Sequence, residues 1–388
     1  MIYFDYAATT PTDPRVVKKM TPYFSELYGN PSSLYRLGRQ AKKAIEDSRA
    51  VVASFLNCAD DEVFFTFGGT ESINMAILGL AKKIGRGKII TSKVEHHAVL
   101  HACQELEKRG FEVEYLPVDS DGLIDLTELE RTIDEKTFLV SIMYANNEVG
   151  SIEPIAKIAK IVKKHRLLRS KNHKNSLPLF LHTDACQATG YLDTDVEKLG
   201  VDLLSFNGSK IYGPKGVGVL YKRSNVEIEP IIFGGGQERG LRSGTENVPG
   251  IVGLSEAVKL IDKADAKKQS KLRDYFISEL LKIEGTNLNG PKKNRLPNNI
   301  NVSFEAIEGE SLMLYLDKAG ICCSTGSACT SALLEPSHVI TALGHSKERA
   351  HGSIRFTIGR KTAKKEIDEA LRAIKKSVLF LRKISAIK

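Results

Sequence analysis

Short apolar runs alternate with amphipathic stretches over residues 15–258 of the chain. Short apolar runs between turn residues favour buried strands, and apolar residues that recur at helical spacing favour helices. The predicted strands are Val63–Phe67, Lys88–Thr91, Glu112–Leu116, Phe138–Met143, Leu179–Thr183, Leu203–Phe206 and Val217–Tyr221. The helices predicted between them include Glu71–Ile84, Ala98–Arg109, Leu126–Ile133 and Pro154–His165. This alternation indicates βαβ units in a mostly parallel sheet with helices on both faces.

The pattern changes after about residue 260. A charged helical stretch, Asp262–Ile283, precedes a polar loop, and the segments NNINVSF and SIRFTIG then enclose a further helix and a loop with cysteines. Strands and helices without strict alternation favour a smaller α+β unit. We therefore expect a large domain over 15–258 and a small domain made of 1–14 and 259–388, with a mobile cysteine loop at about 322–336.

Composition excludes several classes of protein. Of the 388 residues 42% are hydrophobic and 27% charged, which is ordinary for a soluble globular chain. No run approaches the roughly 18 apolar residues of a spanning helix, so we expect no membrane contact. The six cysteines form no CxxC pair and follow no apolar leader, which predicts free thiols in a reducing cytoplasm.

The net charge of +9 raises the possibility of a nucleic-acid partner. Much of the excess lies in residues 360–388, where an apolar stripe predicts a packed amphipathic helix with its basic residues outside. That stripe is Ile367, Leu371, Ile374, Val378 and Leu381. A second basic cluster, 163–174, lies where a helical pattern decays. We interpret both as solvated surface charge, with partner docking as the alternative. The chain has no zinc-finger spacing or RNP-like aromatic pattern, so direct nucleic-acid binding is not expected.

In a parallel sheet, ligands bind beyond the carboxyl ends of the strands. After the first strand, Gly69 and Thr70 open a helix, which suits an anion, although Thr70 could be an ordinary N-cap. His96 follows the second strand, where an imidazole can stack on a flat ligand or carry a proton, or simply cap a helix. Asn147 follows another apolar run and could bind a ligand or stabilise a turn.

Two further strand ends carry groups that are costly to bury alone. Asp184 ends an apolar run and needs a partner, which could be a pyridinium nitrogen or an unseen cation. Lys210 follows Asn207 and Ser209 at the next strand end, where a desolvated amine can form a Schiff base. Lys215 in GPKG is the alternative Schiff-base lysine, but the glycines and proline around it are typical of a turn.

The carboxyl-terminal part adds a thiol and a guanidinium. Cys329 lies among small residues, which suits a reactive thiol in a loop. Arg355 lies in a short strand, and its guanidinium is suited to a carboxylate. An anion site, a histidine, an acid for a ring nitrogen and a Schiff-base lysine together describe a pyridoxal phosphate (PLP) site, while Arg355 suggests an amino-acid substrate.

The chain resembles the cysteine desulfurases of the NifS/IscS type, within the class V aminotransferase-like group. The segments that carry the resemblance run nearly end to end: YFDYAATTP, YGNPSSLYRLGRQA, SFNGSKIYGPKGVG, GGGQERGLRSGTEN, STGSACTSALLEPSHV and AHGSIRFTIGR. The resemblance implies PLP fold-type I, which is aspartate aminotransferase-like, with a mostly parallel seven-stranded sheet in a large domain and a smaller α+β carboxyl-terminal domain.

The resemblance also implies a role for each matching position. Lys210 would hold PLP, His96 would stack on its ring and move protons, and Arg355 would bind the substrate carboxylate. Cys329 would accept the sulfur. The remaining cofactor contacts would be Gly69, Thr70, Asn147, Asp184 at the ring nitrogen, Gln187 at the ring oxygen, Asn207, Ser209 and, from the other subunit of a homodimer, Thr245. Asn147 would also lie beside the substrate, and no metal is expected.

The implied activity is conversion of L-cysteine to L-alanine with a persulfide left on Cys329. The sulfur would pass to an acceptor protein, either an iron–sulfur scaffold or a tRNA-thiolation protein. Ser209 and Tyr35 stand where histidine is common in the family. The alternatives are a selenocysteine lyase or other PLP lyase, which would not need Cys329, and a non-enzymatic assembly scaffold, which would not need Lys210.

Overall fold

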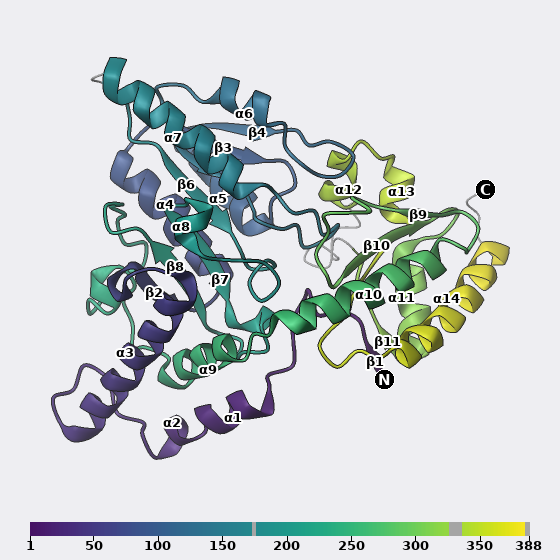
Figure 1. Ribbon diagram of the computed structural model, residues 1–388, viewed down its shortest axis with the longest axis horizontal. Coiled ribbons are helices and arrows are strands. Elements are labelled where there is room, and N and C mark those ends of the chain that lie inside the picture. Colours follow the sequence, from purple (N-terminus) through teal and green to yellow (C-terminus); the bar gives the residue numbers. More distant parts are fainter. Residues whose placement is uncertain (173–175, 326–335, 385–388) are drawn as a thin grey trace.

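The computed structural model of the protein describes residues 1–172, 176–325 and 336–384. Cys329 and most of the predicted 322–336 loop lie outside these residues. Within the described residues the strands form a seven-stranded sheet and two smaller sheets, of three and two strands. Figure 1 shows the large sheet with most of its helices in purple to teal and α9 in green, and beside it the smaller sheets in green to yellow, apart from β1, which is purple.

All seven predicted strands occur in the large sheet, in the order β2-β8-β7-β6-β5-β3-β4. Their bounds are β2 Val63–Thr66, β3 Lys88–Ser92, β4 Glu112–Leu116, β5 Thr137–Ser141, β6 Phe180–Asp184, β7 Leu203–Asn207 and β8 Gly218–Lys222. Only β8 runs antiparallel to its neighbours, β2 and β7, so the sheet is mostly parallel as predicted. The strand ends that carry the predicted site residues therefore lie at one edge.

The sheet has a hydrophobic core on each face, because successive strand side chains point to opposite sides. Phe64 and Leu220 pack on one face with helices α4 and α5, whereas Phe65 and Val219 pack on the other. The helices that contribute to these two cores are α4 Gly69–Ile84 and α5 His97–Lys108 on the first face, and α1 Pro14–Met20, α3 Arg36–Leu56, α6 Leu126–Thr132, α7 Ile155–Asn172, α8 Val196–Leu199 and α9 Val248–Lys259 on the second. Both faces are covered by helices, as the alternating pattern predicts.

The small part has its own core. A three-stranded antiparallel sheet, β12-β10-β9, packs against long helices, and a two-stranded parallel sheet joins β1 to β11. Its elements are β1 Ile2–Tyr3, α10 Lys263–Leu280, β9 Thr286–Leu288, β10 Asn299–Phe304, α11 Gly309–Lys318, β11 Ile321–Cys322, α12 His338–Ala342, α13 Lys347–His351, β12 Ser353–Thr357 and α14 Lys364–Ile384. Strand β1 pairs with β11, so Ile2 and Tyr3 lie against the carboxyl-terminal part of the chain.

Four short helical elements complete the described fold. They are α2 Pro22–Ser25, η1 Asp60–Glu62, η2 Gly208–Lys210 and η3 Glu238–Gly240. None of the helices within the described ranges is long and apolar enough to cross a membrane.

The two basic segments turn out differently. Helix α14 confirms the predicted amphipathic helix, since Ile367, Ile374 and Val378 are fully buried. The predicted end of the other helix at His165 is wrong, because α7 continues to Asn172.

The interpretation of the 163–174 cluster as solvated charge is also wrong for two of its arginines. Arg166 Nε donates to Leu179 O at 2.8 Å and the guanidinium pairs with Asp202. Arg169 is buried and donates to the carbonyls of Leu177 and Asp134. These contacts hold the last turns of α7 in place. The spacing of apolar residues does not predict these turns, because the contacts are made by arginines.

Candidate active site

The strand ends bring the predicted residues together along one edge of the large sheet. Gly69 and Thr70 follow β2, His96 follows β3, and Asn147 follows β5. Asp184 ends β6, and Asn207 to Lys210 follow β7. The short turn η2 places Lys210 beside the amino-terminal segment, where its Nζ donates to Ala8 O at 2.5 Å.

His96 caps helix α5 with its own ring. Its Nδ1 accepts a hydrogen bond from the Ala98 amide at 3.0 Å, so the predicted capping alternative is confirmed. An Nδ1 that accepts cannot carry the ring proton, so neutral His96 holds its proton on Nε2. Burial lowers the pKa of His96 and Lys210 lowers it further, while Asp184 opposes both. The ring is therefore a neutral group with one N–H donor.

Asp184 is buried at the end of β6 with 6% of its surface exposed. Its Oδ1 accepts from the Cys186 amide at 2.8 Å, which fixes the carboxyl at the sheet edge. Gln187, one turn further on, donates from Nε2 to Ala7 O at 3.0 Å. Both predicted ring partners therefore lie on one short turn, and one of them is tied to the amino-terminal segment.

The start of helix α4 has the features of an anion site. Its N-cap is Gly68, and no side chain caps it, so the interpretation of Thr70 as N-cap is wrong. A Cβ at Gly69 would lie 2.6 Å from Cys186 Sγ and 2.9 Å from Asn207 Nδ2. Glycine is therefore required there, and the first amides of a long helix keep no partner within the helix. The Ser209 hydroxyl donates to Asn207 Oδ1 at 3.0 Å on the same side.

Arg355 reaches the site from strand β12 of the small part. Its Nη2 donates to Asp5 Oδ1 at 2.9 Å and its Nη1 to Asn147 O at 3.1 Å. The guanidinium side chain is only 4% exposed, and its Nε has no hydrogen-bond partner among the described residues. A buried N–H without a hydrogen-bond partner costs free energy, so Nε is suited to donate to an anionic group that binds here.

Three acidic residues near the site were not predicted from the sequence. Asp5 pairs with Arg355, and burial raises its pKa although Arg355 opposes that effect. Burial raises the pKa of Glu95 to about 8 and that of Glu148 to about 7. Glu95 accepts from Ser92 Oγ and the Met143 amide, and Glu148 accepts from Ser337 Oγ. The only signal for them in the sequence is an acid in the segment that follows a strand.

Two predicted residues, Thr245 and Cys329, do not belong to the strand ends of the large sheet. Thr245 is exposed in the loop after η3, three residues beyond Arg242, which pairs with Glu71 at 2.8 Å. Cys329 lies outside the described residues. The remaining predicted positions, from Gly69 to Arg355, surround one site.

These residues fit PLP. The phosphate is suited to the uncapped start of α4, and a ring nitrogen is suited to the buried carboxyl of Asp184. The Lys210 amine lies on the adjacent strand end, and the unpaired Arg355 Nε suits a substrate carboxylate. The described residues hold no group of three or more His, Cys, Asp or Glu arranged for a metal ion.

Comparison with known proteins agrees with this fit. The family model of the class-V aminotransferases matches residues 2–370. A cysteine desulfurase IscS of Dictyoglomus turgidum is 49% identical over 394 residues, covering 100% of this chain and 97% of its own. A cysteine desulfurase IscS of Methanosarcina thermophila is 49% identical and covers 99% of this chain and 93% of its own.

Solved structures have the same fold over nearly the whole chain. A NifS-like protein superposes with a TM-score of 0.89 at 41% identity, covering 98% of this chain and 99% of that one. The structure of SspA in complex with cysteine has a TM-score of 0.81 at 36% identity, covering 94% of this chain and 100% of that one.

Proposed function

Because the chain belongs to the class-V aminotransferase family and, within it, to the PLP-dependent cysteine desulfurases, we propose that it converts L-cysteine to L-alanine and leaves the sulfur on Cys329 as a persulfide. One observation supports the roles proposed for these residues. Lys210, His96 and Asp184 lie at one edge of the large sheet, and Arg355 reaches the same edge from the small part. A lysine, an acid and a guanidinium in this arrangement suit an amino acid held at PLP.

When bound, PLP supplies an electron-withdrawing ring that makes the α-proton of an amino acid acidic. Asp184 is placed to keep a ring nitrogen charged, because its carboxyl is fixed by the Cys186 amide. Arg355 orients the substrate through its carboxylate. Lys210 would hold the cofactor and would accept the α-proton of the substrate at Nζ.

The sulfur step needs a thiolate and a proton donor. Cys329 Sγ forms a bond to the sulfur of the substrate cysteine as the carbon–sulfur bond of the substrate breaks. The electron pair of the broken bond stays with the β-carbon. The β-carbon takes up a proton, Lys210 returns the proton from its Nζ to the α-carbon, and alanine leaves. His96 is suited to donate a proton, since Nε2 carries it while Nδ1 caps α5.

We propose that two copies of the chain form the active unit. Phe24, Tyr28, Phe67 and Phe233 are each more than half exposed. Phe67 directly precedes the anion site, and Thr245 lies three residues beyond Arg242, which pairs with Glu71 in the first turn of α4, so an exposed aromatic side chain and the predicted contact of Thr245 belong to the same end of α4. Large exposed apolar side chains favour an interface. Sedimentation of the holoenzyme should give twice the chain mass.

The acceptor of the sulfur would be an iron–sulfur scaffold or a tRNA-thiolation protein. The outer face of α14 carries Lys375 and Lys376 and is proposed as the docking face. Reversal of both charges should weaken acceptor binding with alanine formation unchanged. Unchanged binding would remove α14 from consideration.

The proposed domain division, 15–258 against 1–14 with 259–388, is supported by the separate core of the small part, which includes Phe4, Phe276 and Ile374. Limited proteolysis should cut first at the junction near residue 260.

The decisive experiment measures alanine formed from L-cysteine under reducing conditions. Wild type should form alanine, Cys329→Ala little, and Lys210→Ala none. Cys58→Ala is the matched control, because burial raises the pKa of that thiol to about 12 and it lies before the amino-terminal end of β2, whereas the site lies beyond the carboxyl-terminal end of that strand. Equal alanine from wild type and Cys329→Ala would favour a lyase, and no alanine from cofactor-loaded wild type would favour a scaffold.

A further inference from the structure

The amino-terminal segment Asp5–Asp13 runs along the site and contacts four of its predicted residues. Asp5 pairs with Arg355, Ala7 O accepts from Gln187, and Ala8 O accepts from Lys210. The segment therefore touches the sites proposed for the substrate, the ring and the lysine. The role of this segment depends on the hydrogen bonds that join it to the turn carrying Lys210.

That attachment is made by Thr10, which is fully buried. Its hydroxyl donates to Ser209 O at 2.9 Å and accepts from the Tyr212 amide at 2.8 Å. Its own amide also donates to Ser209 O, at 2.8 Å. One threonine thus binds the backbone on both sides of Lys210, and its hydroxyl uses its donor and an acceptor position.

The turn held by Thr10 is strained. Tyr212 has φ 63°, in the left-handed region that an aromatic residue adopts only when its surroundings enforce it. Besides Thr10, the Asp13 amide donates to Tyr212 O at 2.9 Å, and Tyr212 Oη accepts from the Arg360 amide at 2.8 Å.

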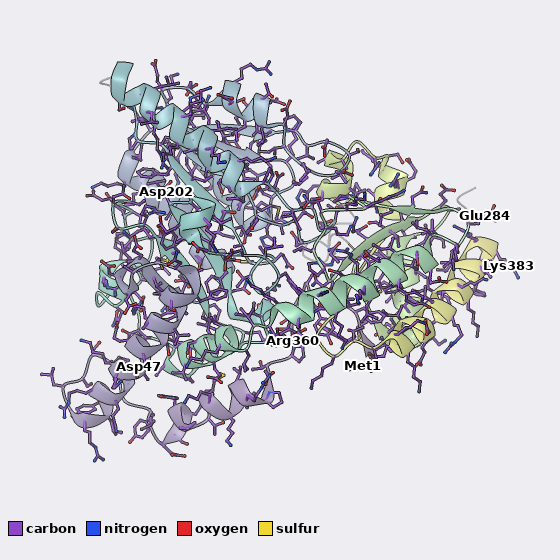
Figure 2. The ribbon with its side chains drawn as sticks, viewed as in Figure 1. Met1, Asp47, Asp202, Glu284, Arg360 and Lys383 are labelled. Carbon is purple, nitrogen blue, oxygen red and sulfur yellow. The ribbon has the colours of Figure 1, made fainter. Side chains whose placement is uncertain are left out.

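Arg360 adds a contact on the ring. Its guanidinium lies 4.3 Å from the centre of the Tyr212 ring and pairs with Asp265 in the first turn of α10 at 2.9 Å. Figure 2 shows Arg360 near the start of α10, where the large and small parts meet. The ring is thus restrained from the small part, while the backbone next to Lys210 is restrained by Thr10.

We propose that Thr10 is a positioning residue for the catalytic lysine: its hydroxyl clamps the Ser209 carbonyl to the Tyr212 amide and so fixes where the Lys210 amine meets the cofactor. The proposal rests on the proposed function, since it takes Lys210 as the residue that holds PLP. A small displacement of a reacting group costs about 10²-fold in rate, so loss of one buried hydroxyl is measurable.

The chain offers a matched control one residue away. Thr9 has a buried hydroxyl without a hydrogen-bond partner in the described part of the chain. Thr10→Val and Thr9→Val therefore make the same chemical change in the same segment, but only the first removes the clamp. Thr10→Ser and Thr10→Ala form a second pair that differs only in the hydroxyl, which keeps the test valid where valine prevents folding.

The measurement is the absorbance of the cofactor joined to Lys210, titrated with pH, beside kcat and KM for cysteine. In Thr10→Val we expect a displaced titration midpoint, faster loss of cofactor on dialysis, and kcat lower by about tenfold or more with KM little changed. Thr10→Ser should restore the wild-type midpoint, Thr10→Ala should not, and Thr9→Val should match wild type.

A folded Thr10→Val or Thr10→Ala protein with the wild-type midpoint and kcat would overturn the proposal. An equal effect of Thr9→Val would also overturn it, because the effect would then belong to the segment and not to the clamp. Failure of the proposed function has a different result: wild type itself would show no cofactor joined to Lys210.

Discussion

The cofactor side and the substrate side of the site are built in different ways. Asp184, His96 and Lys210 stand at strand ends of one sheet, and their places follow from the order of its strands. Arg355 instead comes from the small part and is held by Asp5 and by the Asn147 carbonyl. A change on the first side should therefore disturb the cofactor, and a change on the second should disturb the substrate alone.

The largest effect is expected on the cofactor side, from Asp184→Asn. The amide cannot keep a ring nitrogen charged, so kcat should fall by about 10²- to 10³-fold, the scale for one lost electrostatic group. Absorbance of the bound cofactor should change as well. Ser205→Ala, on the neighbouring strand, is the control, because Ser205 Oγ contacts His182 and not the carboxyl.

The substrate side should respond in the opposite manner. Arg355→Lys keeps a cation but loses the planar fork, so KM for cysteine should rise by about ten- to a hundredfold with the cofactor absorbance unchanged. Changed absorbance without cysteine would show that the two sides are not separable.

A smaller effect is expected from Asp5, which touches the substrate site only through Arg355. Asp5→Ala should raise KM by about tenfold, because a buried guanidinium loses one partner. Asp5→Asn keeps the acceptor at the same place and should recover most of that loss. Equal KM values in both variants would mean that the charge, and not the hydrogen bond, orients Arg355.

The difference between the two sides also explains what the sequence predicts. Asp184 and Lys210 follow buried apolar runs, so the rule of strand ends locates them. Asp5 lies 350 positions from Arg355 and Thr10 lies 199 from Ser209, and no local pattern encodes such contacts. Likewise, the end of α7 depends on arginine contacts with distant carbonyls, and Thr70 loses the cap role because the helix begins two residues earlier than predicted.

Two buried acids that are close in sequence, Glu148 and Glu153, differ in their relation to the site. Glu148 contacts Ser337 and lies next to Asn147, whereas Glu153 accepts from the Ile124 amide and has one oxygen without a partner in the described structure. Burial raises the pKa of Glu153 to about 8. Glu153 is thus a buried acid close in sequence to the site but with no part in it, and its change should affect stability alone.

The smallest effect on catalysis is therefore expected from Glu153→Gln. Its effect is on the free energy of unfolding and depends on pH. The folded protein keeps the Glu153 proton up to pH about 8, whereas the unfolded chain releases it near pH 4.3, so stability falls as pH rises between these values and levels off above. Glutamine does not titrate. Urea unfolding should find the variant close to wild type at pH 5 and more stable than wild type at pH 8, with the difference growing by about 1.4 kcal/mol per pH unit between these values. Because Glu95 and Glu148 still titrate in the variant, part of the slope should remain, and an unchanged slope would show that Glu153 is ionised in the fold. With kcat and KM unaffected, the result would place the boundary of the substrate side between Glu148 and Glu153.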